Sequence, residues 1–289
     1  MNLFIFGAGF SGTASAKEMR GKANAIAGTT RNGDKMSSLA AAGITPFLFD
    51  GETSSADIVR ALGETTHLVL SIAPDARGDP AIRVFGDIIR SDMPRLEWIG
   101  YLSTVGVYGD HGGDWVDEET EPRPVSRRSV ERVAAEQAWQ GLAGARRTPL
   151  AILRLSGIYG PRRNALANLA SGTARRLVKP GQVFNRIHVA DIAGTLAFLA
   201  GRKAGGIFNV TDDLPAPPQD VVAHAARIMG IEAPPEVAFE QADLSPMARS
   251  FYGENKRVSN LRIKSLGYQF RFPDYRAGLA ALWSSGEWR

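Results

Sequence analysis

Short apolar runs alternate with longer segments in which apolar residues recur every three or four positions. The short runs predict buried β-strands, and the longer segments predict amphipathic helices. The predicted strands are 3–6, 23–27, 44–49, 67–72, 96–102, 150–155 and 206–210. The predicted helices are 13–20, 33–42, 54–62, 79–89, 126–142, 187–200 and 218–229. Because strands and helices alternate, we predict an α/β fold with a Rossmann-type, doubly wound parallel sheet of about seven strands.

The last third of the chain departs from this alternation and predicts a second, smaller lobe. We assign residues 1–156 and about 187–210 to the Rossmann domain. Residues of about 157–186 and 211–289 are assigned to a C-terminal α+β lobe. The two parts are therefore predicted to be interleaved along the sequence.

The composition is that of an ordinary globular protein. Of the 289 residues, 44% are hydrophobic and 22% are charged. The chain has no cysteine, which excludes disulfides, thiolate metal sites and cysteine nucleophiles. No apolar run approaches the roughly 18 residues that a membrane span needs. The first residues also lack the basic segment of a signal peptide. We therefore expect a cytoplasmic protein without a membrane partner.

The net charge of +4 raises the question of a nucleic-acid partner. The arginines are dispersed as pairs and lack the interleaved aromatic residues that single-strand binding uses. These pairs lie at 127–128, 146–147, 162–163 and 175–176. The acidic residues between 114 and 121 offer no convergent spacing for a cation. We expect neither a nucleic-acid partner nor a metal site.

The first twelve residues carry the motif on which the functional prediction rests. The strand at 3–6 is followed by glycines in the spacing G-x-G-x-x-G and then by a helix. In a dinucleotide-binding βαβ unit, these glycines allow a tight turn, close approach of the pyrophosphate, and close helix–strand packing. The unpaired N–H groups of the helix N-terminus bind the anion. The residues predicted to contact the cofactor here are Gly7, Gly9, Phe10, Ser11 and Gly12.

The end of the second strand favours NADP over NAD. An NAD-binding fold usually has an acidic residue here for the ribose 2′-hydroxyl, but no Asp or Glu occurs between Glu18 and Asp34. Thr30 and Arg31 occupy this position, and an arginine can pair with a 2′-phosphate in bidentate fashion. The alternative is that Arg31 is an ordinary solvated loop residue.

Three further residues at the ends of predicted strands are assigned to the cofactor site. Asp50, after the third strand, could bond the adenine edge or could instead cap its turn. Ser71 and Ala73 lie at the end of the fourth strand. Small residues there would let the chain pass beside the cofactor.

Three later motifs accompany the glycine motif. They are Ser103-Thr104-Val105-Gly106-Val107-Tyr108-Gly109, Gly157-Ile158-Tyr159-Gly160-Pro161 and His188-Val189-x-Asp191. Together the motifs resemble the extended short-chain dehydrogenase/reductase family, which contains NAD(P)-dependent nucleotide-sugar epimerases and dehydratases. The end of the chain, from residue 256 onward, is similar to the atypical members. The resemblance implies a nicotinamide cofactor, a small-molecule substrate, and a place for Tyr159 beside the cofactor.

The catalytic residues that this resemblance implies are incomplete. The family uses a Ser or Thr to orient the substrate, a Tyr to transfer a proton, and a Lys four residues after the Tyr. Thr104 matches the first of these, although its hydroxyl could equally satisfy a turn. Aligning Glu136 with the family's usual acid puts Arg128 at the Tyr position and Arg132 at the Lys position. A guanidinium stays protonated, so Arg128 cannot transfer that proton, whereas Arg132 could bond a ribose hydroxyl or a negative charge.

Other residues that resemble positions near the family's cleft could supply replacement chemistry. They are Tyr108, Asp110, His111, Tyr159 and His188. His188 is the one most suited to titrate near neutral pH, and its alternative role is hydrogen-bonded packing. The two tyrosines are expected to pack beside the cofactor rather than to act as acids.

These observations lead to two functions of different classes. The first is an NADP-dependent oxidoreductase or epimerase-like enzyme with a non-standard active site. The alternative is a non-catalytic redox or metabolite sensor that reports cofactor occupancy, and a nucleic-acid-associated protein ranks last. The sequence does not identify the substrate, and both a monomer and a homodimer stay open.

Overall fold

The computed structural model describes residues 1–289, apart from the side chains of Pro246 and Met247. The chain divides into two compact units, each assembled from separate segments. Unit 1 consists of Met1–Val107, Arg127–Arg154 and Ile192–Phe208. Unit 2 consists of Tyr108–Ser126, Leu155–Asp191 and Asn209–Arg289.

Unit 1 is built on a seven-stranded sheet in the order β11-β7-β5-β4-β1-β2-β3. The strands are β1 (Asn2–Phe6), β2 (Ala25–Thr30), β3 (Thr45–Leu48), β4 (His67–Leu70), β5 (Trp98–Thr104), β7 (Leu150–Leu155) and β11 (Gly206–Val210). The ladders that join β3, β2, β1, β4 and β5 are parallel, and the predicted doubly wound α/β fold is confirmed. The strand order reverses between β1 and β4, which is where such sheets bind their ligands.

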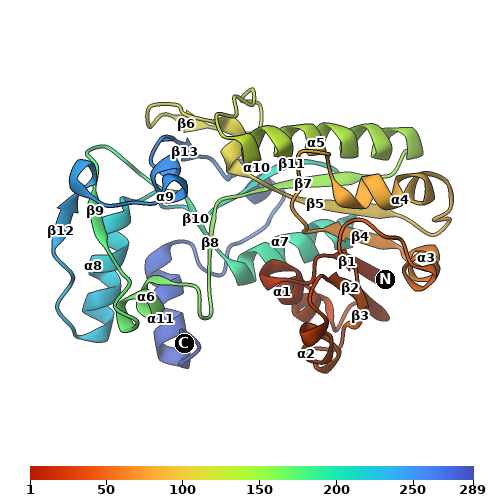
Figure 1. Cartoon of the computed structure of the whole chain (residues 1–289), viewed down its shortest axis with the longest axis horizontal. Coiled ribbons are helices and arrows are strands. Elements are labelled where there is room, and N and C mark those ends of the chain that lie inside the picture. Colours follow the sequence, from red (N-terminus) through yellow and green to blue (C-terminus); the bar gives the residue numbers. More distant parts are fainter. The chain divides into compact units, whose positions relative to one another are not determined.

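Helices cover both faces of this sheet (Figure 1). One face carries α3 (Ala56–Gly63), α4 (Pro80–Ser91) and α5 (Arg127–Arg146), and the other carries α1 (Phe10–Met19) and α7 (Val189–Arg202). A 3-10 turn (Gly33–Lys35) and the short α2 (Met36–Ala41) connect β2 to β3. Large aromatic side chains fill the core beneath α4 and α5, and Phe6, Phe85 and Trp139 are fully buried there.

The second strand was predicted to end at residue 27 but continues to Thr30. Thr29 and Thr30 pair with Phe47 and Leu48 of β3, so the expected loop is part of the sheet. β-branched threonines are typical of strands. Gly28 marks close packing within the strand, because a Cβ there would lie 3.3 Å from the carbonyl oxygen of Ile5.

Unit 2 contains three two-stranded parallel sheets and several short helices. The sheets pair β8 (Gly157–Tyr159) with β10 (Arg186–His188), β9 (Arg176–Val178) with β12 (Glu236–Ala238), and β6 (Trp115–Val116) with β13 (Arg257–Val258). The helices are α6 (Ala165–Ala170), α8 (Pro218–Met229), α9 (Pro246–Phe251), α10 (Leu261–Ser265) and α11 (Tyr275–Ser285), with a 3-10 turn at Phe239–Gln241. Leu166, Ala225 and Leu279 share a buried core between α6, α8 and α11. Throughout the described chain, no helix is long and apolar enough to cross a membrane.

Two segments of unit 2 differ from the sequence-based expectation. Residues 108–126, expected in the Rossmann domain, belong to unit 2, where the N–H groups of His111 and Gly113 each donate to Asn255 O at 3.0 Å. The helix predicted at 187–200 begins only at Val189, because the preceding residues form β10. Both differences arise from pairings between segments that are distant in sequence.

Candidate functional site

The loop after β1 has the geometry that its glycines predict. Gly7 has φ +89°, and a Cβ there would lie 2.8 Å from Ile72 Cγ2 and 3.0 Å from Ile72 N. Glycine is thus required at this position both by the backbone conformation and by the space. A Cβ on Gly12 would lie 2.4 Å from Gly7 O, so the third glycine is required for helix–strand packing. Gly9 differs, because a Cβ there would meet none of the described atoms within 4 Å. The chain itself therefore leaves the space beside Gly9 open.

Thr29 of β2 holds this loop in place. Its hydroxyl oxygen accepts a hydrogen bond from Gly7 N at 2.9 Å, and its carbonyl oxygen accepts one from Ala8 N at 2.8 Å. The residue is 1% exposed. Thr29 was not among the predicted site residues, because the second strand was predicted to end at residue 27. The β-branched pair Thr29–Thr30 was the signal that could have extended the strand.

The N-terminus of α1 follows the loop and, among the described residues, has neither a capping side chain nor an acidic residue to satisfy its N–H groups. Gly9 is the N-cap residue, no side chain of the described residues caps the helix, and the first turn contains no acidic residue. Helix N-termini present N–H groups without intrahelical partners, and the helix dipole favours negative charge there. Of the predicted contact residues, Phe10 is 36% exposed and Ser11 is buried. This end of α1 is suited to hold a pyrophosphate.

Thr30 and Arg31 lie at the carboxyl end of β2, as predicted. The Thr30 hydroxyl closes a local turn: its oxygen accepts from Asn32 N at 3.2 Å and its proton goes to Asn32 O at 3.3 Å. Arg31 is exposed and makes no hydrogen bond or ion pair with the described residues. Its guanidinium is therefore available to a ligand.

The remaining predicted cofactor residues in unit 1 follow β3 and β4. Asp50 caps its own turn, because Oδ1 accepts from Glu52 N at 2.8 Å and Thr53 N at 3.0 Å. These two N–H donors lower the pKa of Asp50. An adenine contact by Asp50 stays a prediction. Ser71 N donates to Phe6 O at 2.8 Å, which places the segment of Ser71 and the exposed Ala73 beside the glycine loop.

The end of β5 brings two hydroxyl groups to one glycine. Thr104 Oγ1 accepts a hydrogen bond from Gly106 N at 3.1 Å, so the turn-forming role considered for Thr104 is present. Its own proton can still be donated. A Cβ on Gly106 would lie 2.9 Å from Ser129 Oγ and 3.4 Å from Thr104 Oγ1. Ser129 was not among the predicted site residues. Its position directly after Arg128, at the start of α5, could have pointed to it.

A buried network fixes α5 against the sheet. Glu136 is 3% exposed, and it accepts hydrogen bonds from the hydroxyl of Ser103 and from Arg154 Nη2, the latter at 2.8 Å. These bonds tie the middle of α5 to the ends of β5 and β7. Arg128 lies exposed in the first turn of α5.

Arg132, one helical turn after Arg128, is half-buried. Its Nη1 donates to Tyr101 Oη at 3.0 Å and to Leu102 O at 2.9 Å. Burial raises the pKa of the Tyr101 phenol, which therefore stays neutral and accepts this hydrogen bond. Neither arginine can exchange a proton at neutral pH. The start of α5 thus presents positive charge where the resemblance implied a proton-transferring pair.

Tyr159 and His188 lie in unit 2, where they pack on each other. Their rings are 5.1 Å apart, and a second ring, that of Phe272, lies 4.2 Å from His188. Tyr159 Oη donates to Asp274 O at 3.4 Å, and burial raises the pKa of this phenol. His188 Nδ1 accepts from Ala190 N at 3.2 Å. Burial lowers the pKa of His188 to about 4, so the imidazole is neutral near pH 7.

The other residues considered for replacement chemistry also have structural partners in unit 2. Tyr108 is fully buried, and its hydroxyl donates to Asn209 Oδ1 at 2.7 Å. Asp110 accepts from Asn255 N at 2.7 Å, and this donor lowers the pKa of its carboxyl. His111 Nε2 lies 3.1 Å from Tyr108 O. The described residues contain no group of three His, Cys, Asp or Glu side chains arranged to hold a metal ion.

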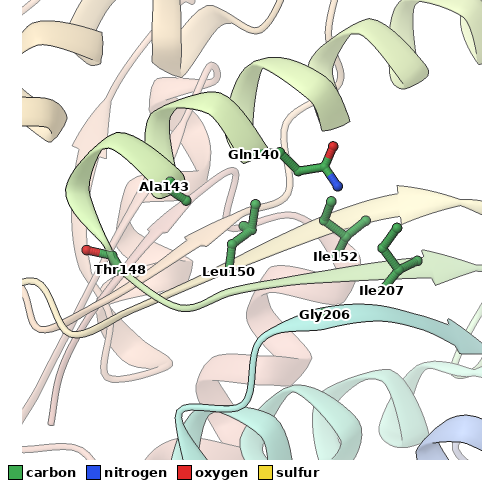
Figure 2. A pocket seen from close by; sticks show the side chains of 8 residues that line it. Gln140, Ala143, Thr148, Leu150, Ile152, Gly206 and Ile207 are labelled. Carbon is green, nitrogen blue, oxygen red and sulfur yellow. The ribbon is translucent and has the colours of Figure 1, made fainter.

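A hollow of about 240 Å³ lies in unit 1 between α5 and the strands β7 and β11 (Figure 2). Its lining includes Gln140, Thr148 and Ile152 and contains no titratable side chain. The hollow is at the β11 edge of the sheet, whereas the glycine loop follows β1 near the centre. It therefore offers no acid, base or nucleophile and is separate from the predicted site.

Comparison with known proteins gives both a family and a set of similar folds. Residues 90–211 match the NAD dependent epimerase/dehydratase family. A functionally unknown conserved protein from Silicibacter pomeroyi DSS is 47% identical, with a TM-score of 0.89 over 99% of each chain. A protein from Methylobacillus flagellatus named "putative NAD-dependent epimerase/dehydratase" is 26% identical, with a TM-score of 0.76 over 99% of this chain and 98% of that one. UDP-glucose 4-epimerase from Thermus thermophilus, in complex with NAD, is 20% identical and has the same fold, with a TM-score of 0.77 over 98% of each chain. No curated protein matches the chain.

The matched stretch from residue 90 to 211 contains the regions in which the catalytic positions were sought. It includes Thr104, Arg128, Arg132 and His188. The Silicibacter pomeroyi relative extends the similarity to 99% of the chain. The chain therefore belongs to the NAD-dependent epimerase/dehydratase family of extended short-chain dehydrogenase/reductases.

Proposed function

We propose that the protein binds NADP in unit 1 and is an NADP-dependent oxidoreductase or epimerase-like enzyme with a non-standard active site. The observation that carries this proposal is the loop after β1. Gly7 and Gly12 are required by space, Thr29 pins the backbone, and the side of the loop at Gly9 is open. A loop held this firmly next to an uncapped helix N-terminus fits a pyrophosphate.

The preference for NADP rests on the end of β2. Arg31 is exposed and has no partner among the described residues, and no carboxylate lies next to it in the sequence to repel a 2′-phosphate. A guanidinium can pair with that phosphate through two parallel hydrogen bonds. The NAD-bound epimerase with the same fold is evidence about that protein and does not decide the preference of this one.

The chemistry proposed for the site differs from the family's usual proton transfer. A bound nicotinamide would supply or accept a hydride. Thr104 can donate its hydroxyl proton to a substrate oxygen, because its oxygen already accepts from Gly106 N. Arg132 can bind a hydroxyl or negative charge but cannot act as a base. A substrate that needs little proton transfer from the protein fits these groups.

A non-catalytic cofactor sensor is the second candidate, and one observation favours it. Aligning Glu136 with the family's usual acid puts arginines at both positions of the Tyr–Lys pair, and Tyr159 and His188 are buried among structural partners. The cofactor loop would then report occupancy without supporting a reaction. The two candidates share the cofactor and differ only in turnover.

Titration and turnover together test the proposal. We expect calorimetry to show that NADPH binds more tightly than NADH. We also expect purified protein to consume NADPH in a screen of carbonyl compounds and sugar nucleotides. Binding without turnover would support the sensor, and absence of binding would overturn both candidates.

A further inference from the structure

Arg132 is held more closely than a solvated surface arginine. Its Nη1 makes two hydrogen bonds, to Tyr101 Oη at 3.0 Å and to Leu102 O at 2.9 Å. The guanidinium carbon lies 5.5 Å from the centre of the Tyr101 ring, within the range of a cation–π interaction. Tyr101 is fully buried in β5, so this support cannot swing away. The guanidinium is therefore held in one orientation near the carboxyl end of β5.

The other nitrogens of this guanidinium have no partner among the described residues. Nε and Nη2 of Arg132 make no hydrogen bond to the described residues. Neither atom is among the buried side-chain nitrogens that lack a partner. Burial raises the pKa of the Asp79 carboxyl and the charge of Arg132 opposes that rise, but Asp79 is already engaged by other donors. It accepts from Trp139 Nε1 at 3.0 Å and from Ala81 N at 2.8 Å, and it forms no ion pair with Arg132, both residues being described in full.

The geometry of Nε and Nη2 of Arg132 determines the kind of ligand that this guanidinium can bind. Nε and Nη2 carry two parallel N–H groups that match the two oxygens of a carboxylate or phosphate. A lysine at the same position would offer a compact point charge instead of this fork. We propose that Arg132 binds an oxyanion of the molecule that reacts with the cofactor, so that the substrate is a small carboxylate or phosphate compound. The inference rests on the proposed function, because it assumes a reaction partner for NADP.

Two neighbours of Arg132 agree with an anionic ligand. Arg128 precedes Arg132 by four residues on α5, and like charges at this spacing repel each other. A bound anion would relieve that repulsion. Thr104, two residues after Leu102 on β5, can donate its proton to a second ligand oxygen. Because β4 separates β5 from β1, these groups lie about two strand spacings, on the order of 10 Å, from the glycine loop.

The test uses malonate and inorganic phosphate as probes of the NADPH-saturated protein. Each probe is titrated by calorimetry, while NADPH fluorescence reports whether the cofactor stays bound. We expect at least one probe to bind without displacing NADPH. Arg132→Lys, which keeps the charge and removes the fork, should weaken that binding about tenfold. Tyr101→Phe, which removes the acceptor but keeps the ring, should weaken it less.

Arg127→Lys is the matched control, because Arg127 is exposed on the same helix and pairs with Glu131 at 2.8 Å. It should leave probe binding unchanged, and thermal unfolding should show that all three variants are folded. Unchanged probe binding in Arg132→Lys would overturn the inference while leaving NADPH binding intact. Displacement of NADPH by the probe would also overturn it, since the anion would then be the cofactor's own phosphate. If the wild-type protein does not bind NADPH at all, the proposed function is overturned instead.

Discussion

The loop after β1 and the paired strands β8 and β10 both carry motifs of the same family, but their polar groups lie in opposite environments. Around the glycine loop, a Cβ added to Gly9 would have no described neighbour within 4 Å, and the helix N-terminus has no side-chain cap. On β8 and β10, Tyr159 and His188 are buried, pack ring against ring, and have pKa values far from neutral pH. The first region is open to a ligand, whereas the second is closed on itself.

This contrast shows that a residue's place in a family motif does not by itself assign it a chemical role. The role proposed for the glycine loop uses its backbone, so it needs no side chain at the three glycine positions. A proton-transferring role for Tyr159 or His188 would require titration, and burial holds both side chains in their neutral forms near pH 7. Cofactor binding and proton transfer are therefore separable properties of this fold: the groups proposed for the first are open, and the groups considered for the second are buried.

The largest expected effect comes from filling the packed side of the glycine loop. Gly12→Val should lower NADPH affinity by about 100-fold or more, because its Cβ would lie 2.4 Å from Gly7 O and force the loop to move. Overpacking of this kind costs about 1–3 kcal/mol of folding stability. Calorimetry would measure the affinity, and urea unfolding would measure the stability.

Gly9→Ala is the matched control for that loop. Its backbone φ of −85° suits any residue, and the new Cβ would meet no described protein atom within 4 Å. We expect folding stability to change by less than about 1 kcal/mol while NADPH affinity falls about tenfold. Equal losses of stability in both variants would show that the space beside Gly9 is structural rather than ligand-facing.

The glycine loop was predictable from sequence because its determinants are local. A strand, three glycines at fixed spacing and a helix follow one another within the first twenty residues, and the apolar runs also located all seven strands of the main sheet. The role of Thr29 was less predictable, because it depends on hydrogen bonds from Gly7 N and Ala8 N, about twenty residues earlier in the chain. The same limit applies to residues 108–126, whose strand β6 pairs with β13 more than a hundred residues later.

The arginines of α5 show a second limit of sequence reasoning. Alignment placed Arg128 and Arg132 at the Tyr and Lys positions, and elementary chemistry excluded proton transfer. The support that Tyr101 gives to Arg132 could not be read from spacing, because it depends on how α5 lies on β5. That position is set by the buried network of Glu136, Ser103 and Arg154. Chemical exclusion was possible from sequence, but the orientation of the free guanidinium edge was not.

The closed environment of His188 predicts a pH effect on stability. Its folded pKa of about 4 lies below the usual value of 6.5, so the unfolded chain takes up this proton first as the pH falls. The stabilisation is present above about pH 6.5 and is lost progressively toward pH 4. By linkage, the free energy of unfolding should fall by about 2 kcal/mol between pH 7 and pH 5 on account of this residue.

Urea unfolding at the two pH values would measure this effect. His188→Phe keeps a ring between Tyr159 and Phe272 but cannot take up a proton, so its stability should depend less on pH by about that amount. His111→Gln is the control and should keep the wild-type dependence. An unchanged pH dependence in His188→Phe would mean that the imidazole is accessible to solvent, which would make β8 and β10 resemble the open loop.

The smallest of these effects concerns which dinucleotide the open region prefers. Arg31→Ala should reduce the ratio of NADPH to NADH affinity about tenfold, mainly by weakening NADPH, because one charge-assisted bidentate contact is lost. Folding stability should not change, since Arg31 is exposed and has no partner among the described residues. Arg60→Ala is the matched control: Arg60 is an exposed arginine on α3 that pairs with Asp57 at 3.1 Å, and its loss should leave the ratio intact. If Arg31→Ala also leaves the ratio intact, the end of β2 does not select the cofactor. The glycine loop would then bind either dinucleotide through its backbone alone.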